Sequence, residues 1–209
     1  MSRFVVKQLF LAGLVIGLAW TAPTPAAATI ASTDVATEEK IIGSDKALVT
    51  LIEYASLGCS HCAQFHKDTF PKIKKDYIDT GKLRMIYRDF PLGTPALAAA
   101  MIARCSGRNR YFGFVNLLFR SQAQWSRSEN PLEALTKVAR FGGLSADDVN
   151  ACLQNQSLLD SIQSKARKAQ NNHGIKSTPS FIINGTSISG AVTYDEFRKV
   201  IDRALKQAQ

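Results

Sequence analysis

The chain has 209 residues, a formal net charge of +9 and a hydrophobic content of 45%. At about 100–200 residues per domain, this length predicts one domain, or one domain with an insertion. Ordinary hydrophobic and charged content excludes disorder of the whole chain, which requires low hydrophobicity and high charge. Thirteen Gly and seven Pro exclude a collagen-like or low-complexity chain. Four Cys are too few for a small disulfide scaffold.

The N-terminal residues have the order of segments that is typical of a secretory signal peptide. Arg3 and Lys7 precede an apolar run over residues 9–20, and residues 26–28 are small enough for cleavage. The apolar run is shorter than the roughly 18–20 residues that span a bilayer, and an uncleaved membrane anchor is the alternative. We predict a signal peptide over residues 1–28 and export to the periplasm.

The basic residues do not form one stripe. They concentrate on two predicted helices, near residues 72–75 and 165–168, and such charges usually mark a solvated helix face. Nucleic-acid binding would require a basic stripe on a recognisable module. We therefore expect no nucleic-acid partner.

The first half of the exported chain predicts a β-α-β unit. Residues 29–40 are small and polar and are expected to form a loose arm. A mostly apolar, β-branched run over 47–54 predicts a buried strand, and alternation over 82–88 predicts a second strand. The helix predicted between them, over 60–80, contains Pro71, which should kink or split it because proline has no N–H. Two parallel strands are the default for such a unit.

The second half predicts a block of helices and then a return to strands. Apolar residues recur at helical spacing over 95–172, and no convincing strand lies there. Residues 179–189 predict a hairpin with an Asn-Gly turn, and a capping box at 193–196 begins a terminal helix. We expect an α/β domain with its first half at 41–94, a helical insertion at 95–172 and its second half at 173–209.

Cys59 and Cys62 form a Cys-x-x-Cys pair where the first strand gives way to a helix. A helix N-terminus favours a thiolate and lowers the pKa of a Cys from about 8.5 to roughly 3.5–7.5. Cys62 lies one turn further on, so the pair can close a disulfide and exchange two electrons with a dithiol. Ser60 and His61 surround the Cys59 sulfur, and a more stable thiolate makes the disulfide more oxidising.

Other interpretations of the cysteines remain open. The pair resembles half of a structural zinc site, but His66 offers only a third ligand, and we predict no metal and no cofactor. A purely structural disulfide over so short a loop would constrain little. Cys105 and Cys152 are the other thiols of an exported chain, and we expect a structural disulfide between them. Free buried thiols or a second redox role are the alternatives.

Four motifs, in order, resemble the DsbA family of bacterial exported thiol–disulfide oxidoreductases. They are Glu-Tyr at 53–54, Cys-Ser-His-Cys at 59–62, Tyr-Arg-Asp-Phe-Pro-Leu at 87–92 and Ser-Thr-Pro-Ser-Phe at 177–181. The resemblance covers residues 41–205. It implies a thioredoxin fold, β-α-β then β-β-α, with an inserted all-helical subdomain.

The resemblance also implies roles for single residues. Cys59 is similar to the exposed nucleophile and Cys62 to its buried partner. Pro179 is similar to the cis-proline that faces the disulfide, with a trans-proline at a strand start as the alternative. Thr178 would present its backbone to an extended substrate. Glu53 resembles a buried acid that accepts a proton from Cys62, although a solvated Glu at a strand edge is also possible.

The function implied is donation of disulfides to reduced, unfolded or partly folded exported proteins. A DsbB-like membrane oxidase would restore the Cys59–Cys62 disulfide, and we expect a monomer. The Ser-His pair departs from the Pro-His of the best-known oxidases, and Thr178 resembles the isomerase branch. Only about a dozen residues precede residue 41 after cleavage, too few for the dimerisation region of that branch. We therefore favour an oxidase over an isomerase or reductase, and over a noncatalytic chaperone or binding module of this fold.

Overall fold

The structure is a computed structural model that describes residues 30–208. The predicted signal peptide over residues 1–28 lies outside the described residues. The centre of the molecule is a five-stranded sheet in the order β1-β3-β2-β4-β5. Its strands are β1 (Lys40–Ile42), β2 (Val49–Ala55), β3 (Leu83–Asp89), β4 (Ser180–Ile183) and β5 (Thr186–Ser189).

Strand pairing agrees with the predicted β-α-β and β-β-α units. β2 and β3 are parallel, while β4 is antiparallel to β2 and forms a hairpin with β5. Both predicted strands of the first unit are present, shifted by one or two residues. Glu53, in the central strand β2, is flanked by Tyr87 of β3 and Phe181 of β4. This places a carboxyl group in the middle of the sheet.

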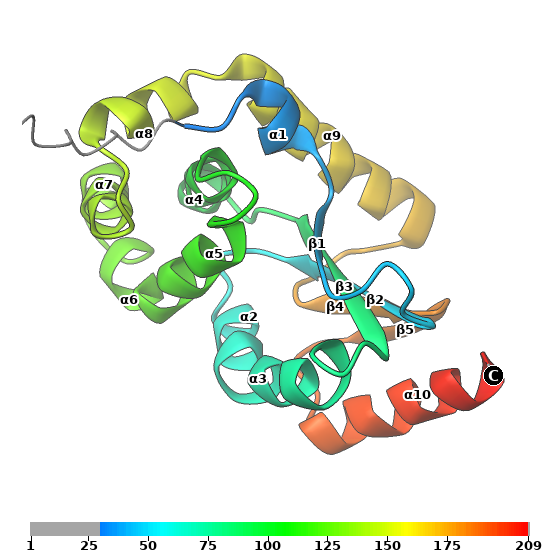
Figure 1. Cartoon of the computed structure of the whole chain (residues 1–209). Coiled ribbons are helices and arrows are strands. Elements are labelled where there is room, and N and C mark those ends of the chain that lie inside the picture. Colours follow the sequence, from blue (N-terminus) through cyan, green and yellow to red (C-terminus); the bar gives the residue numbers. More distant parts are fainter. Residues whose placement is uncertain (1–29, 209) are drawn as a thin grey trace, which may run out of the picture.

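The predicted helix over residues 60–80 runs without a break to Ile78, but it alternates between α-helical and π-helical segments on both sides of Pro71. It consists of α2 (Ser60–Gln64), a π-helical segment η1 (Phe65–Thr69), α3 (Phe70–Ile73) and a second π-helical segment η2 (Lys74–Ile78). Pro71 lies in the first turn of α3, directly after η1, and because it has no N–H it donates no bond to the preceding turn. This rod and α10 (Tyr194–Gln207) cover one face of the sheet, below it in Figure 1.

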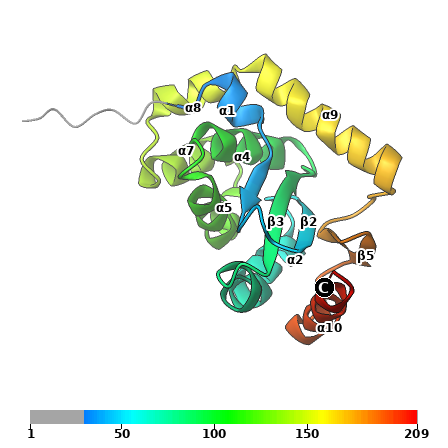
Figure 2. The same ribbon diagram turned by 45° about the vertical axis from the view of Figure 1, so that its right-hand side comes forward.

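The helical insertion lies between β3 and β4 and has no strand within residues 95–172. It comprises α4 (Thr94–Cys105), α5 (Tyr111–Arg120), α6 (Gln122–Trp125), α7 (Pro131–Phe141), α8 (Ala146–Leu153) and α9 (Gln156–His173). A disulfide joins Cys105, at the end of α4, to Cys152 in α8. The long helix α9 returns the chain along the other face of the sheet (Figures 1 and 2). None of the described helices combines the length and the apolar character needed to cross a bilayer.

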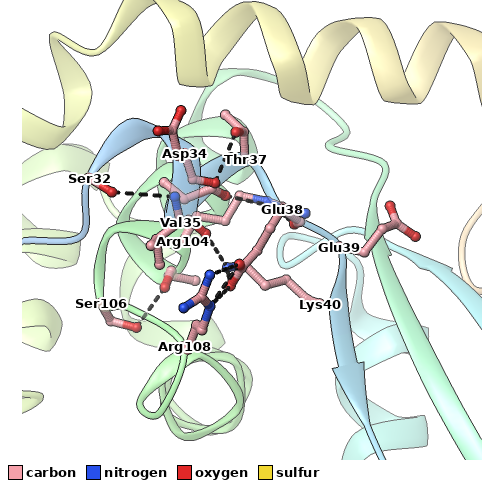
Figure 3. Close-up of polar contacts among 12 residues, drawn as sticks. Ser32, Asp34, Val35, Thr37, Glu38, Glu39, Lys40, Arg104, Ser106 and Arg108 are labelled. Atoms are coloured by element: carbon pink, nitrogen blue, oxygen red, sulfur yellow. Dashed lines mark hydrogen bonds and ion pairs between the residues drawn. The ribbon is translucent and has the colours of Figure 1, made fainter. Parts of the chain in front are cut away.

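The expectation of a loose arm over residues 29–40 was wrong for its described part. This segment forms α1 (Thr33–Thr37) and enters the sheet as β1, antiparallel to β3. Arg104 of α4 donates hydrogen bonds to the carbonyls of Ala36 at 2.8 Å and Glu38 at 3.0 Å (Figure 3). The order of the arm comes from these tertiary contacts with the insertion, which its own composition does not reveal.

Candidate active site

Cys59 lies between the C-terminal end of β2 and the first turn of α2. It is the N-cap of α2 with extended backbone angles, φ −85° and ψ 122°. Its own N–H donates to the carbonyl of Ser56 at 3.0 Å, which closes the turn after β2. The side chain is partly exposed. The thiol therefore lies at a helix N-terminus with access to solvent, as the sequence predicted.

The surroundings of Cys59 favour its thiolate. A hydrogen bond from the Cys62 thiol is the largest influence, and it lowers the pKa of Cys59 to about 5. Partial burial acts in the opposite direction, while the Thr178 hydroxyl and the N–H groups of His61 and Cys62 lower the pKa further. Cys59 is thus ionised at neutral pH when the pair is reduced.

Cys62 has the opposite character, because it is fully buried beneath the first turn. Burial raises the pKa of Cys62 far above its ordinary value, and the hydrogen bond to Cys59 and the negative charge of Glu53 add to this effect. Both cysteines are free thiols in this structure. One sulfur of the pair is a ready nucleophile and leaving group, and the other holds its proton.

Thr178 and Pro179 bring a second segment of backbone against Cys59. The Thr178–Pro179 peptide bond is cis, in agreement with the resemblance. The thiol of Cys59 lies 3.2 Å from the Thr178 carbonyl oxygen. The Thr178 hydroxyl is buried and has no hydrogen-bond partner among the described residues, so it is available to the thiolate once Cys59 ionises.

Glu53 is completely buried, so the alternative of a solvated carboxylate at a strand edge was wrong. Its two carboxylate oxygens lie 3.0 and 2.9 Å from Nε2 of His66, in η1. From the sequence, His66 was considered only as a third potential zinc ligand and was not connected with Glu53. A usable signal was present, because His66 follows Cys62 by four residues and therefore lies on the same helical face.

A second side chain that sequence reasoning missed is Gln122, in α6 of the insertion. Its amide donates to the carbonyls of Leu57 at 2.6 Å and Cys59 at 3.0 Å. The insertion thus holds the active-site turn directly. No local sequence pattern predicts a contact between residues that are more than sixty positions apart.

The remaining predicted site residues are more peripheral. The side chains of Ser60 and His61 are exposed beside the thiol. Cys105 and Cys152 are buried in the insertion and bonded to each other. Within residues 30–208, no three His, Cys, Asp or Glu side chains are grouped so as to hold a metal ion.

A thioredoxin-fold sheet that presents an asymmetric pair of thiols opposite a cis-proline defines a class of protein, the thiol–disulfide exchange proteins. A family model described as "Thioredoxin" matches residues 36–203. The chain belongs to this thioredoxin family.

Similar proteins and solved structures indicate which members of the thioredoxin family this chain resembles. A putative protein-disulfide oxidoreductase of Rickettsia felis is 32% identical over 170 residues, covering 81% of this chain and 61% of the relative. The chain therefore spans about three fifths of the length of such relatives. The crystal structure of alpha-DsbA1 of Wolbachia pipientis matches with a TM-score of 0.77 and 36% identity, covering 82% of this chain and 92% of that one. Disulfide bond formation protein D of Bacillus subtilis is a more distant relative, at 24% identity over 80% of this chain and 78% of its own length.

These comparisons place the chain among DsbA-like proteins of the thioredoxin family. They agree with the resemblance inferred from the four sequence motifs.

Proposed function

We propose that this protein is a thiol–disulfide oxidoreductase that donates the Cys59–Cys62 disulfide to reduced proteins. The observation that carries the proposal is the asymmetry of the pair. The pKa of Cys59 is lowered to about 5, while that of Cys62 is raised far above its ordinary value. A stabilised thiolate favours the reduced form and makes the disulfide a strong oxidant.

The exchange proceeds in two steps. A substrate thiolate attacks Sγ of Cys59, the Cys59–Cys62 bond breaks, and its electron pair leaves on Cys62, which takes up a proton. A second substrate thiolate then attacks the substrate sulfur of the mixed disulfide. Cys59 leaves as a thiolate, and its low pKa makes it a good leaving group.

The loop before β4 would position the substrate. Because the Thr178 carbonyl lies 3.2 Å from Sγ of Cys59, a peptide that pairs with this backbone brings its own cysteine to the sulfur. Strand addition of this kind uses main-chain hydrogen bonds and tolerates many sequences. The substrates proposed are therefore unfolded or partly folded proteins.

Export, recycling and oligomeric state belong to the same proposal. Residues 1–28 would direct the chain to the periplasm, where an oxidising environment permits disulfides. A DsbB-like membrane oxidase would reoxidise the reduced pair, and the protein would act as a monomer without a cofactor or metal.

A redox titration tests the proposal. The purified protein is equilibrated with glutathione buffers, and the reduced fraction is determined by alkylation and mass. We expect a potential near the roughly −120 mV of a strong oxidant. A value near the roughly −270 mV of thioredoxin would contradict the oxidase assignment. Normal exchange by a folded Cys59→Ala variant would contradict the whole mechanism.

Isomerase activity is a second candidate, favoured by Thr178 before the cis-proline. Refolding of a scrambled, fully oxidised substrate distinguishes the two. An oxidase leaves such a substrate scrambled, whereas an isomerase restores its activity.

A further inference from the structure

We propose that His66 is a positioning residue that passes protons between solvent and Glu53, so that the buried Glu53–His66 pair supplies the proton that Cys62 takes up during disulfide donation. The inference rests on the proposed function, because only disulfide exchange places a negative charge on the buried sulfur.

The pair is built into the centre of the domain. Glu53 has no exposed surface, and the His66 side chain is 5% exposed. Nε2 of His66 lies within 3.0 Å of both carboxylate oxygens. A buried carboxylate without a partner is costly, and in the described part of the chain His66 is the side chain that bonds to it. The two groups can therefore share a proton.

Aromatic rings fix the imidazole in this position. Phe119 of α5 stacks on His66 with centroids 4.5 Å apart and an interplanar angle of 26°. Phe70 lies 5.0 Å away, and Phe65 meets the ring edge-on at 5.3 Å. Because ring faces accommodate a cation, this enclosure is compatible with imidazolium as well as imidazole. The ring is thus held against Glu53 in either protonation state.

His66 also connects the pair to solvent. It lines a cleft of about 830 Å³ between the α2–η2 rod and α5 of the insertion. The walls include Phe70, Phe112 and Phe119, whereas Glu53 is not among the lining residues. His66 therefore stands between the carboxylate and the cleft, and a proton that reaches Glu53 from this side passes through the imidazole.

Other ionisable groups face the pair from each packed element. Cys62 of α2 and Tyr87 of β3 lie next to the pair, and the cleft that His66 lines also carries Lys67 and Asp68 of η1, Lys74 of η2 and Arg120 of α5. Burial raises the pKa of Tyr87 well above its ordinary value, so this phenol stays neutral. Among these groups, Glu53 and His66 are joined directly by hydrogen bonds, and Glu53 acts on the buried Cys62.

A substrate thiolate forms a bond to Sγ of Cys59, the Cys59–Cys62 bond breaks, and the electron pair remains on Sγ of Cys62. The proton shared by Glu53 and His66 passes to Cys62, which becomes a thiol. Water in the cleft returns one proton to His66, and the pair is restored. Reoxidation runs this sequence in reverse.

The test uses single-turnover reduction of the oxidised full-length protein by excess dithiothreitol between pH 5 and 9. Rates are divided by the thiolate fraction of the reductant, so that the remaining pH dependence belongs to the protein. The wild-type rate should then fall as pH rises, because Cys62 needs a proton from the pair. His66→Gln keeps an N–H for Glu53 but cannot carry a proton. The rate of this variant should no longer fall with pH, and it should be about tenfold lower than the wild-type rate. This loss is smaller than the roughly 10²–10⁴-fold that a directly acting general acid contributes.

Two comparisons separate proton transfer from mere packing. The double variant Glu53→Gln/His66→Gln should react no more slowly than Glu53→Gln, because the two residues act as one unit. His173→Gln is the matched control, since His173 is an exposed His at the end of α9, and its profile should equal that of wild type. If His66→Gln folds poorly, His66→Ala is measured with and without added imidazole. Recovery of the reduction rate on addition of imidazole supports proton transfer through residue 66.

The inference is overturned if folded His66→Gln keeps the wild-type profile, if the two substitutions have additive effects, or if imidazole does not rescue His66→Ala. Failure of the proposed function looks different, because it shows in the redox titration as a potential near that of thioredoxin, whatever the pH profiles of the His66 variants are.

Discussion

At the scale of single residues, Cys59 should behave as a thiolate across most of the pH range. Hydrogen bonding from Cys62 lowers its pKa to about 5, well below the roughly 8.5 of an ordinary Cys. We expect the rate of iodoacetamide alkylation of the reduced protein to rise with a midpoint near pH 5 and to stay flat from about pH 6 to 8. Glutathione, as the control, should keep rising over that interval. A midpoint near that of glutathione would contradict the description of the site.

The sequence predicted the site unevenly, for a physical reason. Cys59 and Cys62 are identified by local chemistry, a thiol pair one helical turn apart at the end of a strand. The partner of Glu53 is not, because the contact with His66 crosses from β2 to η1 and depends on the packing of both against the sheet. Interactions within one element can be predicted from spacing, and interactions between elements require the fold.

At the scale of elements, α6 should stabilise the active-site turn. Gln122 donates to the carbonyls of Leu57 and Cys59, and Gln122→Ala leaves both without this donor. We expect the free energy of unfolding to fall by about 1–3 kcal/mol, and amide exchange to accelerate at residues 57–60. Gln124→Ala is the matched control, because Gln124 is exposed on the same helix, and it should change stability by less than about 0.5 kcal/mol. Equal effects of the two substitutions would contradict this role.

The sequence predicted those helices and strands that carry a local signal, either a hydrophobic periodicity or a helix cap. The alternation of buried and less buried residues along β3 and the capping boxes of α8 and α10 are local signals. The helix α1 is only five residues long, too short to be stable alone. Its order depends on Arg104 and on Lys165, whose ammonium group donates to the Thr37 carbonyl. Composition alone therefore suggested a loose arm where the fold provides anchors.

At the scale of the whole molecule, the Cys105–Cys152 disulfide links the first helix of the insertion to α8. The two residues are 47 apart in sequence, and closing a loop of this length stabilises the folded state by about 4 kcal/mol in the chain-entropy model. We expect Cys105→Ala/Cys152→Ala to lower the free energy of unfolding by about 2–4 kcal/mol, measured in urea. An unchanged urea midpoint with an unchanged slope would show that the bond contributes nothing to stability.

Charge on one sulfur should make global stability depend on redox state. The folded pKa of Cys59 is depressed, so its contribution is complete above about pH 9 and is lost as pH falls toward 5. Cys62 has a raised folded pKa, so its contribution is complete below about pH 9 and does not change in this interval. The oxidised form has neither ionisation, and its four-residue loop adds little chain entropy. We therefore expect the reduced protein to be the more stable form at pH 7.

Urea unfolding of both forms at pH 4, 5, 6 and 7 measures this difference in the free energy of unfolding. The gap between the reduced and oxidised forms should close as pH falls. Because the same thiolate makes the disulfide oxidising, a gap that stays constant with pH would remove the electrostatic basis of the redox potential as well.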